Sequence, residues 1–201
     1  MQDTEKKAQK DRPELADFRV AILVADGTEE TELLEPLRAL HSAGARVEIL
    51  APGGKAIRCF RQMEPAGSIQ ATRRLEDAQP DHYSGLLLPG GALAADRLRA
   101  IPEALAFAHS FQEQEKPIAA ICHAPWILIS AGLVRGRTLT SHPGIGDDIR
   151  NAGGKWVDNE TECDSNWVTS RNTADLPAFC REMIGLFARS TPPVIQVDLS
   201  A

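Results

Sequence analysis

The sequence predicts an α/β domain with a mostly parallel sheet and helices on both of its faces. Three short, nearly continuous apolar runs, at 18–25, 85–88 and 117–121, are typical of strands that are buried on both sides. Each run ends abruptly at Asp, Pro-Gly-Gly or Cys and is followed by a helical pattern. Strands that alternate with helices form parallel sheets.

The first half of the chain has the pattern strand, helix, strand. Residues 18–25 (FRVAILVA) form the first strand. Thr28 can cap the next helix, because acidic residues, which favour a helix N-terminus, follow it directly. We expect that helix to end near Gly44. A second strand, ARVEILA, follows at 45–51 and stops at Pro-Gly-Gly.

The same unit recurs in the second half, and no internal repeat or linker interrupts it. The expected elements are a strand at 85–88, a helix at 102–115, a strand at 117–121, a helix at 123–131, strands at 137–140, 155–157 and 166–169, a short helix at 145–151 and a closing helix at 173–189. We therefore predict one domain at 18–190. Residues 1–17 are expected to be a charged, disordered extension and 191–201 a loosely held tail.

The composition is that of an ordinary globular protein. The 201 residues are 43% hydrophobic and 25% charged, with a net charge of −6. A chain of this size can bury about 70% of its unfolded surface, so its stability requires no metal or disulfide. An acidic chain has no overall field that attracts nucleic acid or anionic lipid. No apolar run is long enough for a secretory signal or a membrane span, so we expect a cytoplasmic protein.

The cysteine pattern excludes the common metal and redox motifs. Cys59, Cys122, Cys163 and Cys180 form no CxxC pair and have no paired histidines, so we expect free thiols and no metal. A dinucleotide site is not expected either, because the chain contains no GxGxxG motif.

Cys122 is the strongest candidate for a reactive residue. It follows a buried strand directly and precedes a helix, as the nucleophile of a sharp strand-to-helix turn does. Such a turn requires small residues two positions before and after the nucleophile, and Ala120 and Ala124 occupy these positions. The helix N-terminus is expected to lower the pKa of the thiol. The alternative is a buried, inert cysteine.

Other strand ends supply candidate helpers, because the carboxyl ends of parallel strands meet at one edge of the sheet. His123 would be a general base if its ring turned alongside the sulfur, and is otherwise a packing residue. Glu29 can point into the same cleft and donate a proton, although the sequence does not separate it from Glu30 or Glu32.

Backbone groups complete the candidate site. The N–H groups of Gly90 and Gly91, together with that of Ala124, could bind a developing oxyanion. A plain turn after a strand is the alternative for the two glycines. Asp96 and His142 are candidates at the rim of the cleft.

The chain resembles the PfpI family, the intracellular cysteine peptidase-like branch of the superfamily that includes the parkinsonism-associated deglycase. The resemblance covers about 18–188. The motifs that carry it lie at 29–33 (EETEL), 87–91 (LLPGG), 117–125 (PIAAICHAP), 128–137, 143–148, 151–153 and 166–171.

The resemblance implies a flavodoxin-like three-layer sandwich that forms a homodimer or a larger homo-oligomer. It also implies Cys122 as nucleophile, Glu29 as the acid bonded to the sulfur and His123 as base. Asp96 would bind the histidine of an adjoining subunit. Two features depart from the family pattern: Ala124 replaces the usual glycine, and the segment 54–75 differs.

The resemblance also implies activity without a cofactor. Our leading expectation is a cysteine-dependent stress-protection enzyme that hydrolyses reactive dicarbonyls or glycation adducts on small molecules or proteins. One alternative is an intracellular cysteine peptidase. Another is a non-enzymatic redox sensor or chaperone that uses oxidisable Cys122.

Overall fold

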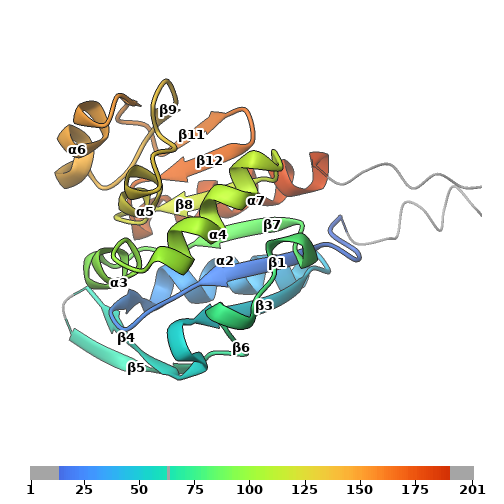
Figure 1. Ribbon diagram of the computed structural model, residues 1–201. Coiled ribbons are helices and arrows are strands. Elements are labelled where there is room, and N and C mark those ends of the chain that lie inside the picture. The colour runs from blue at the N-terminus through green and yellow to red at the C-terminus, as the bar shows by residue number, and fades with distance from the viewer. Residues whose placement is uncertain (1–13, 63, 191–201) are drawn as a thin grey trace, which may run out of the picture.

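The computed structural model describes residues 14–62 and 64–190 and confirms the predicted α/β architecture (Figure 1). Its strands are β1 (Arg19–Leu23), β2 (Thr28–Glu29), β3 (Arg46–Ala51), β4 (Ala56–Arg61), β5 (Glu64–Gln70), β6 (Arg73–Arg74), β7 (Gly85–Leu88), β8 (Ile118–Ile121), β9 (Thr138–Leu139), β10 (Lys155–Trp156), β11 (Thr161–Asp164) and β12 (Trp167–Ser170). Its helices are α2 (Glu30–Ser42), α3 (Ala92–Leu98), α4 (Pro102–Glu113), α5 (Pro125–Ser130), α6 (Gly146–Asn151) and α7 (Leu176–Arg189).

The central sheet has seven strands in the order β11-β12-β8-β7-β1-β3-β6. All neighbouring pairs are parallel except β11 and β12, which are antiparallel. The chain first builds outward from β1 to β3 and β6, and then returns to place β7 on the other side of β1. The order therefore reverses between β1 and β7, which is where such folds form ligand crevices.

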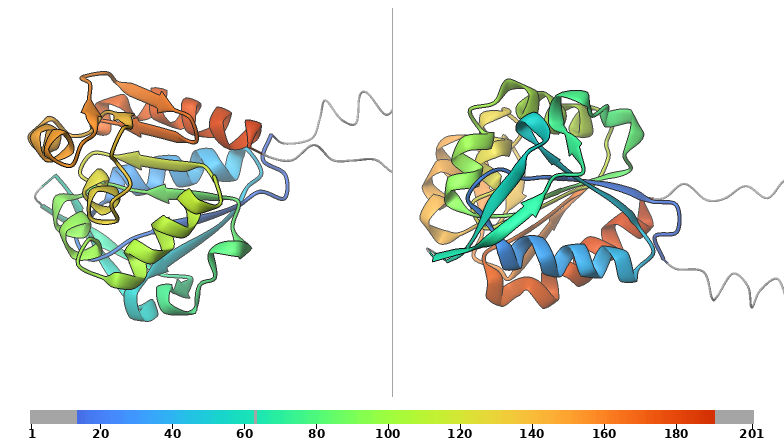
Figure 2. Two further views of the ribbon diagram at one scale, coloured as in Figure 1. Left: turned by 45° about the horizontal axis from the view of Figure 1, so that its top comes forward. Right: turned by 90° about the horizontal axis from the view of Figure 1, so that it is seen from below.

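Helices cover both faces of this sheet and make two cores. In Figure 2, α2 and α7 lie along one face, whereas α4 and α5 lie along the other. Alternate residues of β1 enter the two cores: Val20 and Ile22 pack with the first pair of helices, and Ala21 and Leu23 with the second. The near-continuous apolar run of this strand follows from burial on both faces.

Two smaller sheets complete the fold. The segment that departed from the family pattern forms a hairpin of β4 and β5, which joins β2 in a three-stranded sheet near α3 (Figure 1). The β5 strand is mostly exposed, which explains its weak apolar pattern. β9 and β10 pair in parallel beside α6.

Two expectations about local structure need correction. Thr28 does not cap α2, because it lies in β2 and its hydroxyl donates to the Ala25 carbonyl at 2.8 Å. Packing also begins before residue 18, since Leu15 is fully buried and its N–H donates to the Ala43 carbonyl. The rest of the expected N-terminal extension and the tail at 191–201 lie outside the described residues.

Within residues 14–62 and 64–190, none of the helices combines the length and the hydrophobicity that a bilayer span requires.

Candidate active site

Cys122 lies on a sharp turn between β8 and α5. Its φ of 63° is in the left-handed region, which non-glycine residues adopt at a cost of about 1–3 kcal/mol. The small residues expected around such a turn, Ala120 and Ala124, are both fully buried. The Cys122 N–H donates to Ser170 of the adjoining strand and its carbonyl accepts from His142. The backbone is therefore held in the strained conformation that raises the side chain out of the sheet.

His123 turns its ring back toward this sulfur. Its Nδ1 lies 3.2 Å from Cys122 Sγ, so the two side chains meet although they are neighbours in sequence. The ring stacks on His142 with centroids 4.4 Å apart and meets the edge of Trp126 at 5.2 Å. This packing fixes the ring orientation that a general base requires.

The acid beside the sulfur is Glu32, and not Glu29 as expected. Glu32 lies in the first turn of α2, where it is buried with Leu33, Pro36 and Leu40, and only 2% of its surface is exposed. Its carboxyl interacts with the Cys122 thiol and with the Gly90 N–H. Burial and the charge of Glu29 raise the pKa of Glu32 to about 8. The carboxyl is therefore protonated at neutral pH and can donate a proton.

Glu29 lies one step further from the sulfur. It is in extended conformation at the N-terminus of α2, and its Oε2 accepts from the Gln62 N–H at 2.7 Å. Burial raises the pKa of this carboxyl, while hydrogen bonds from the backbone of Gln62 and Thr31 and the charge of Arg61 act in the opposite direction. Its charge nevertheless acts on the Cys122 thiol.

The expected backbone donors of Gly90, Gly91 and Ala124 have three different partners, and the His123 N–H joins them. The N–H groups of Gly91 and His123 point at the sulfur and favour its ionised form. The Gly90 N–H serves Glu32 instead. The Ala124 N–H donates to the Ile121 carbonyl at 3.1 Å, so it does not face the site as expected.

Cys122 is protonated at neutral pH, contrary to the lowered pKa that we expected. Burial is the largest cause; together with the charge that Glu32 carries once it ionises above about pH 8, it raises the pKa of the thiol to about 12 and outweighs the backbone donors. Burial and the nearby His142 lower the pKa of His123 to about 4, so this imidazole is neutral. In the tautomer with the proton on Nε2, Nδ1 can accept the thiol proton. The geometry therefore supports transfer of the thiol proton to His123 as the sulfur attacks the substrate. It does not support a thiolate that is already present before the attack.

His142 supports His123 from the loop after β9. Its Nδ1 accepts from the Gly144 N–H at 3.1 Å, which holds the ring in place. The stacked contact therefore places a second, partly buried imidazole beside His123.

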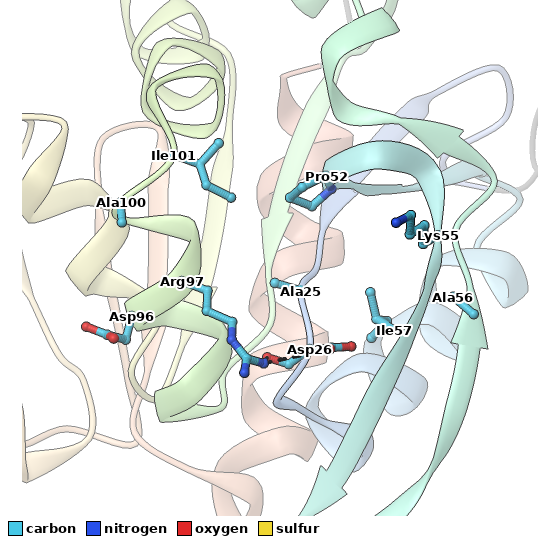
Figure 3. A pocket seen from close by; sticks show the side chains of 10 residues that line it. All are labelled: Ala25, Asp26, Pro52, Lys55, Ala56, Ile57, Asp96, Arg97, Ala100 and Ile101. Carbon is cyan, nitrogen blue, oxygen red and sulfur yellow. Dashed lines mark hydrogen bonds and ion pairs between the residues drawn. The ribbon is translucent and has the colours of Figure 1, made fainter.

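Asp96 lies elsewhere on the same edge of the sheet. It is exposed on α3, and Figure 3 shows its carboxylate pointing away from Arg97. The two residues border a cavity of about 620 Å³, where the Arg97 guanidinium donates to the Asp26 carbonyl. Among the described residues no hydrogen bond or ion pair joins Asp96 to His123 of the same chain, so the expected contact would have to come from another subunit.

The other three cysteines are free thiols outside this cluster. Cys59 is buried, Cys163 is exposed and Cys180 is half-buried. In the described part of the chain no three His, Cys, Asp or Glu side chains are grouped so that they could hold a metal ion.

Sequence reasoning missed the position of Glu32, although a signal was present. Glu32, Pro36 and Leu40 are spaced by four residues, which places them on one face of a helix, and this face is buried. An acidic residue on a buried helical face is unusual and marks a candidate site.

Fold and site together define a class of protein, the flavodoxin-like α/β proteins with a cysteine nucleophile on a strand-to-helix turn. Residues 18–186 match the DJ-1/PfpI family, and the chain belongs to this family.

Individual relatives agree with this assignment. The chain is 41% identical over 173 residues to a deglycase of Pyrococcus abyssi, covering 84% of this chain and 99% of the relative. It is 35% identical over 169 residues to the putative cysteine protease YraA of Bacillus subtilis, covering 84% and 97%. The crystal structure of Drosophila melanogaster DJ-1beta matches with a TM-score of 0.79 at 25% identity, covering 86% and 91%.

Proposed function

We propose that this protein is a deglycase that uses Cys122 to hydrolyse adducts of reactive dicarbonyls, or to hydrate the free aldehyde. The observation that carries the proposal is the 3.2 Å contact between Cys122 Sγ and the neutral His123 Nδ1, with the protonated Glu32 carboxyl beside the same sulfur. A nucleophile, a base and an acid therefore share one small site. The deglycase of Pyrococcus abyssi, at 41% identity, supports this substrate class.

The first step follows from these positions. His123 Nδ1 takes the thiol proton while Cys122 Sγ adds to the carbonyl carbon of the substrate. One S–C bond forms, and the electron pair of the C=O π bond moves to oxygen. The N–H groups of Gly91 and His123, which face the sulfur, lie where they can stabilise that oxygen, and Glu32 gives it a proton. Water then adds to this carbon as the S–C bond breaks and its electron pair returns to sulfur; one water proton goes to Glu32 and His123 returns the thiol proton to Cys122. An adduct enters the same path once its C–N or C–S bond breaks, which re-forms the C=O group while the hydroxyl proton leaves with the amine or thiol.

The test uses hemithioacetal and arginine adducts that are made from methylglyoxal with N-acetylcysteine and N-acetylarginine. Cys122→Ser should lose turnover by a factor on the order of 10³ or more, because the nucleophile is removed. Cys163→Ser is the matched control, since this exposed cysteine lies outside the site, and it should keep wild-type turnover. Equal turnover by Cys122→Ser and the wild type would refute the proposal.

A cysteine peptidase is the second candidate. The same Cys122–His123 contact would serve amide hydrolysis, and the putative cysteine protease of Bacillus subtilis favours this alternative. Cleavage of fluorescent casein that disappears in Cys122→Ser, without dicarbonyl turnover in the wild type, would identify the peptidase.

The raised pKa of the Cys122 thiol argues against a redox sensor, because thiolates oxidise far faster than thiols. Intact mass after mild peroxide treatment measures this directly. Selective gain of oxygen at Cys122, in the absence of any dicarbonyl turnover, would favour the sensor.

We further propose a homo-oligomer in which Asp96 of one subunit binds the Nε2–H of His123 in its neighbour. The exposure of Asp96 on α3 supports this arrangement, as does the Nε2–H tautomer in which His123 Nδ1 accepts the Cys122 proton.

A further inference from the structure

We propose that Glu29 is a positioning residue: it is the ionised member of a buried carboxyl pair, and its charge keeps the proton on Glu32. The inference deepens the proposed function, since Glu32 is the acid of that reaction.

Both carboxyls of the pair are buried and incompletely satisfied. Glu29 is 8% exposed and Glu32 is 2% exposed. Glu29 Oε1 and Glu32 Oε2 are buried oxygens that have no hydrogen-bond partner among the described residues. Burying two ionised carboxylates side by side is strongly unfavourable, so we expect the pair to carry one negative charge.

The surroundings decide which member is charged. Glu29 Oε2 accepts from the Gln62 N–H at 2.7 Å, and the positive charge of Arg61 favours its ionised form. Glu30, which also faces Glu29, is itself ion-paired with Arg61. The carboxylate at position 29 is therefore stabilised by a backbone donor and a cation.

Among the described residues, no cation acts on Glu32 as Arg61 acts on Glu29. The groups that act on it are the Glu29 carboxyl, the Cys122 thiol and the Gly90 N–H. A Cβ on Gly90 would collide with Glu32 Oε2, so the carboxyl is packed directly against the backbone at the end of β7. The ionised form is opposed by burial and by Glu29, and the proton stays on Glu32.

Cys59, on β4 beside β2, faces Glu29. Burial and the charges of Glu30 and Glu29 raise the pKa of its thiol to about 11, so it is neutral and adds no charge.

The arrangement separates two tasks between two similar side chains. Glu29 provides a fixed negative charge, while Glu32 holds a proton that can be delivered at the sulfur. Environments that separate the pKa values of two neighbouring carboxyls in this way commonly make one of them the proton donor of a reaction.

The test is an infrared titration of the protonated carboxyl band, with Glu32→Gln used to assign the band to Glu32. In Glu29→Gln the amide oxygen can still accept from Gln62, but the charge is lost. Charges roughly 6 Å apart at an effective dielectric of about 20 interact by about two pH units. We therefore expect the midpoint of Glu32 to fall by about one to two pH units.

Two further variants separate charge from structure. Glu29→Asp keeps the charge and should leave the midpoint near the wild-type value. Glu30→Gln removes a neighbouring charge of the same sign that is not among the groups acting on Glu32, and should shift the midpoint by much less than Glu29→Gln. An unchanged midpoint in Glu29→Gln, or an equal shift in Glu30→Gln, would overturn the inference.

If Glu29→Gln does not fold, the wild type still provides a test by NMR of ¹³C-labelled glutamate. The Glu32 resonance should move twice with pH, once as Glu29 ionises and once at its own midpoint, and a single transition would overturn the inference. Neither titration needs a substrate. A failure here therefore leaves the deglycase proposal standing, and an absence of turnover leaves the carboxyl pair untouched.

Discussion

Replacing Glu32 by Gln should remove a pH-dependent loss of stability. In the folded protein, burial and the Glu29 charge raise the pKa of Glu32 from its ordinary value of 4.5 to about 8. The native state thus binds more protons than the unfolded state between these values. The stabilisation is complete below pH 4.5 and is lost as the pH rises to about 8.

The size of the effect follows from the same values. Each pH unit corresponds to about 1.4 kcal/mol, so the full difference is about 5 kcal/mol. Between pH 5.5 and 8 the free energy of unfolding of the wild type should fall by about 3 kcal/mol relative to Glu32→Gln. A constant offset from the new amide does not matter, because only the pH dependence is compared.

Urea unfolding at several pH values between 5.5 and 8 measures this difference. Glu35→Gln, an exposed substitution on the same helix, should keep the wild-type slope because Glu32 is intact. If the wild type and Glu32→Gln lose stability in parallel as the pH rises, Glu32 does not carry the proton that the account assigns to it.

Three further predictions concern neighbouring positions. Gly90→Ala should abolish most turnover and lower the free energy of unfolding by about 2 kcal/mol or more, because its Cβ would lie 2.6 Å from Cys122 Cβ and collide with Glu32. The adduct assay measures the first effect and urea unfolding the second. Gly132→Ala, where a Cβ meets nothing within 4 Å, should cost only about 1 kcal/mol and leave turnover intact. His142→Phe should raise the pKa of His123, since it removes the imidazole that lowers this pKa. NMR titration of the His123 ring measures the change, and an unchanged pKa would contradict the prediction. Asp96→Asn should lower kcat without changing the oligomer seen by size-exclusion chromatography, whereas unchanged kcat would remove Asp96 from the proposed site.

The turn that carries Cys122 was predictable because local sequence determines it. A buried strand must end before a helix, and only small flanks such as Ala120 and Ala124 fit around the strained residue. The contact with His123 was less predictable, since it depends on how His142 and Trp126 pack around the ring.

The acid was misplaced for a different reason. Three acidic residues lie within four positions, and the choice among them depends on where β2 ends and α2 begins. Because Glu29 is still extended and Glu32 is one turn into the helix, only Glu32 faces the sulfur. The hairpin of β4 and β5 escaped notice because its outer strand is exposed and has no strong apolar alternation.

The thiol pKa shows a competition that sequence alone could not resolve. A helix N-terminus favours the thiolate, but burial at Cys122 outweighs it, and Glu32 opposes the thiolate further once it ionises. The balance depends on the depth of the sulfur and on one neighbour from another element, and both are properties of the folded chain.

The most direct test of the account is acid quenching of the protein during turnover of methylglyoxal, followed by intact mass and peptide mapping. We predict an adduct of one methylglyoxal on Cys122, with formation slowed in His123→Ala because the base at 3.2 Å from the sulfur is missing. An adduct on Cys163 instead would contradict this prediction. Turnover that continues while Cys122 stays unmodified, or after it is replaced by serine, would contradict it as well.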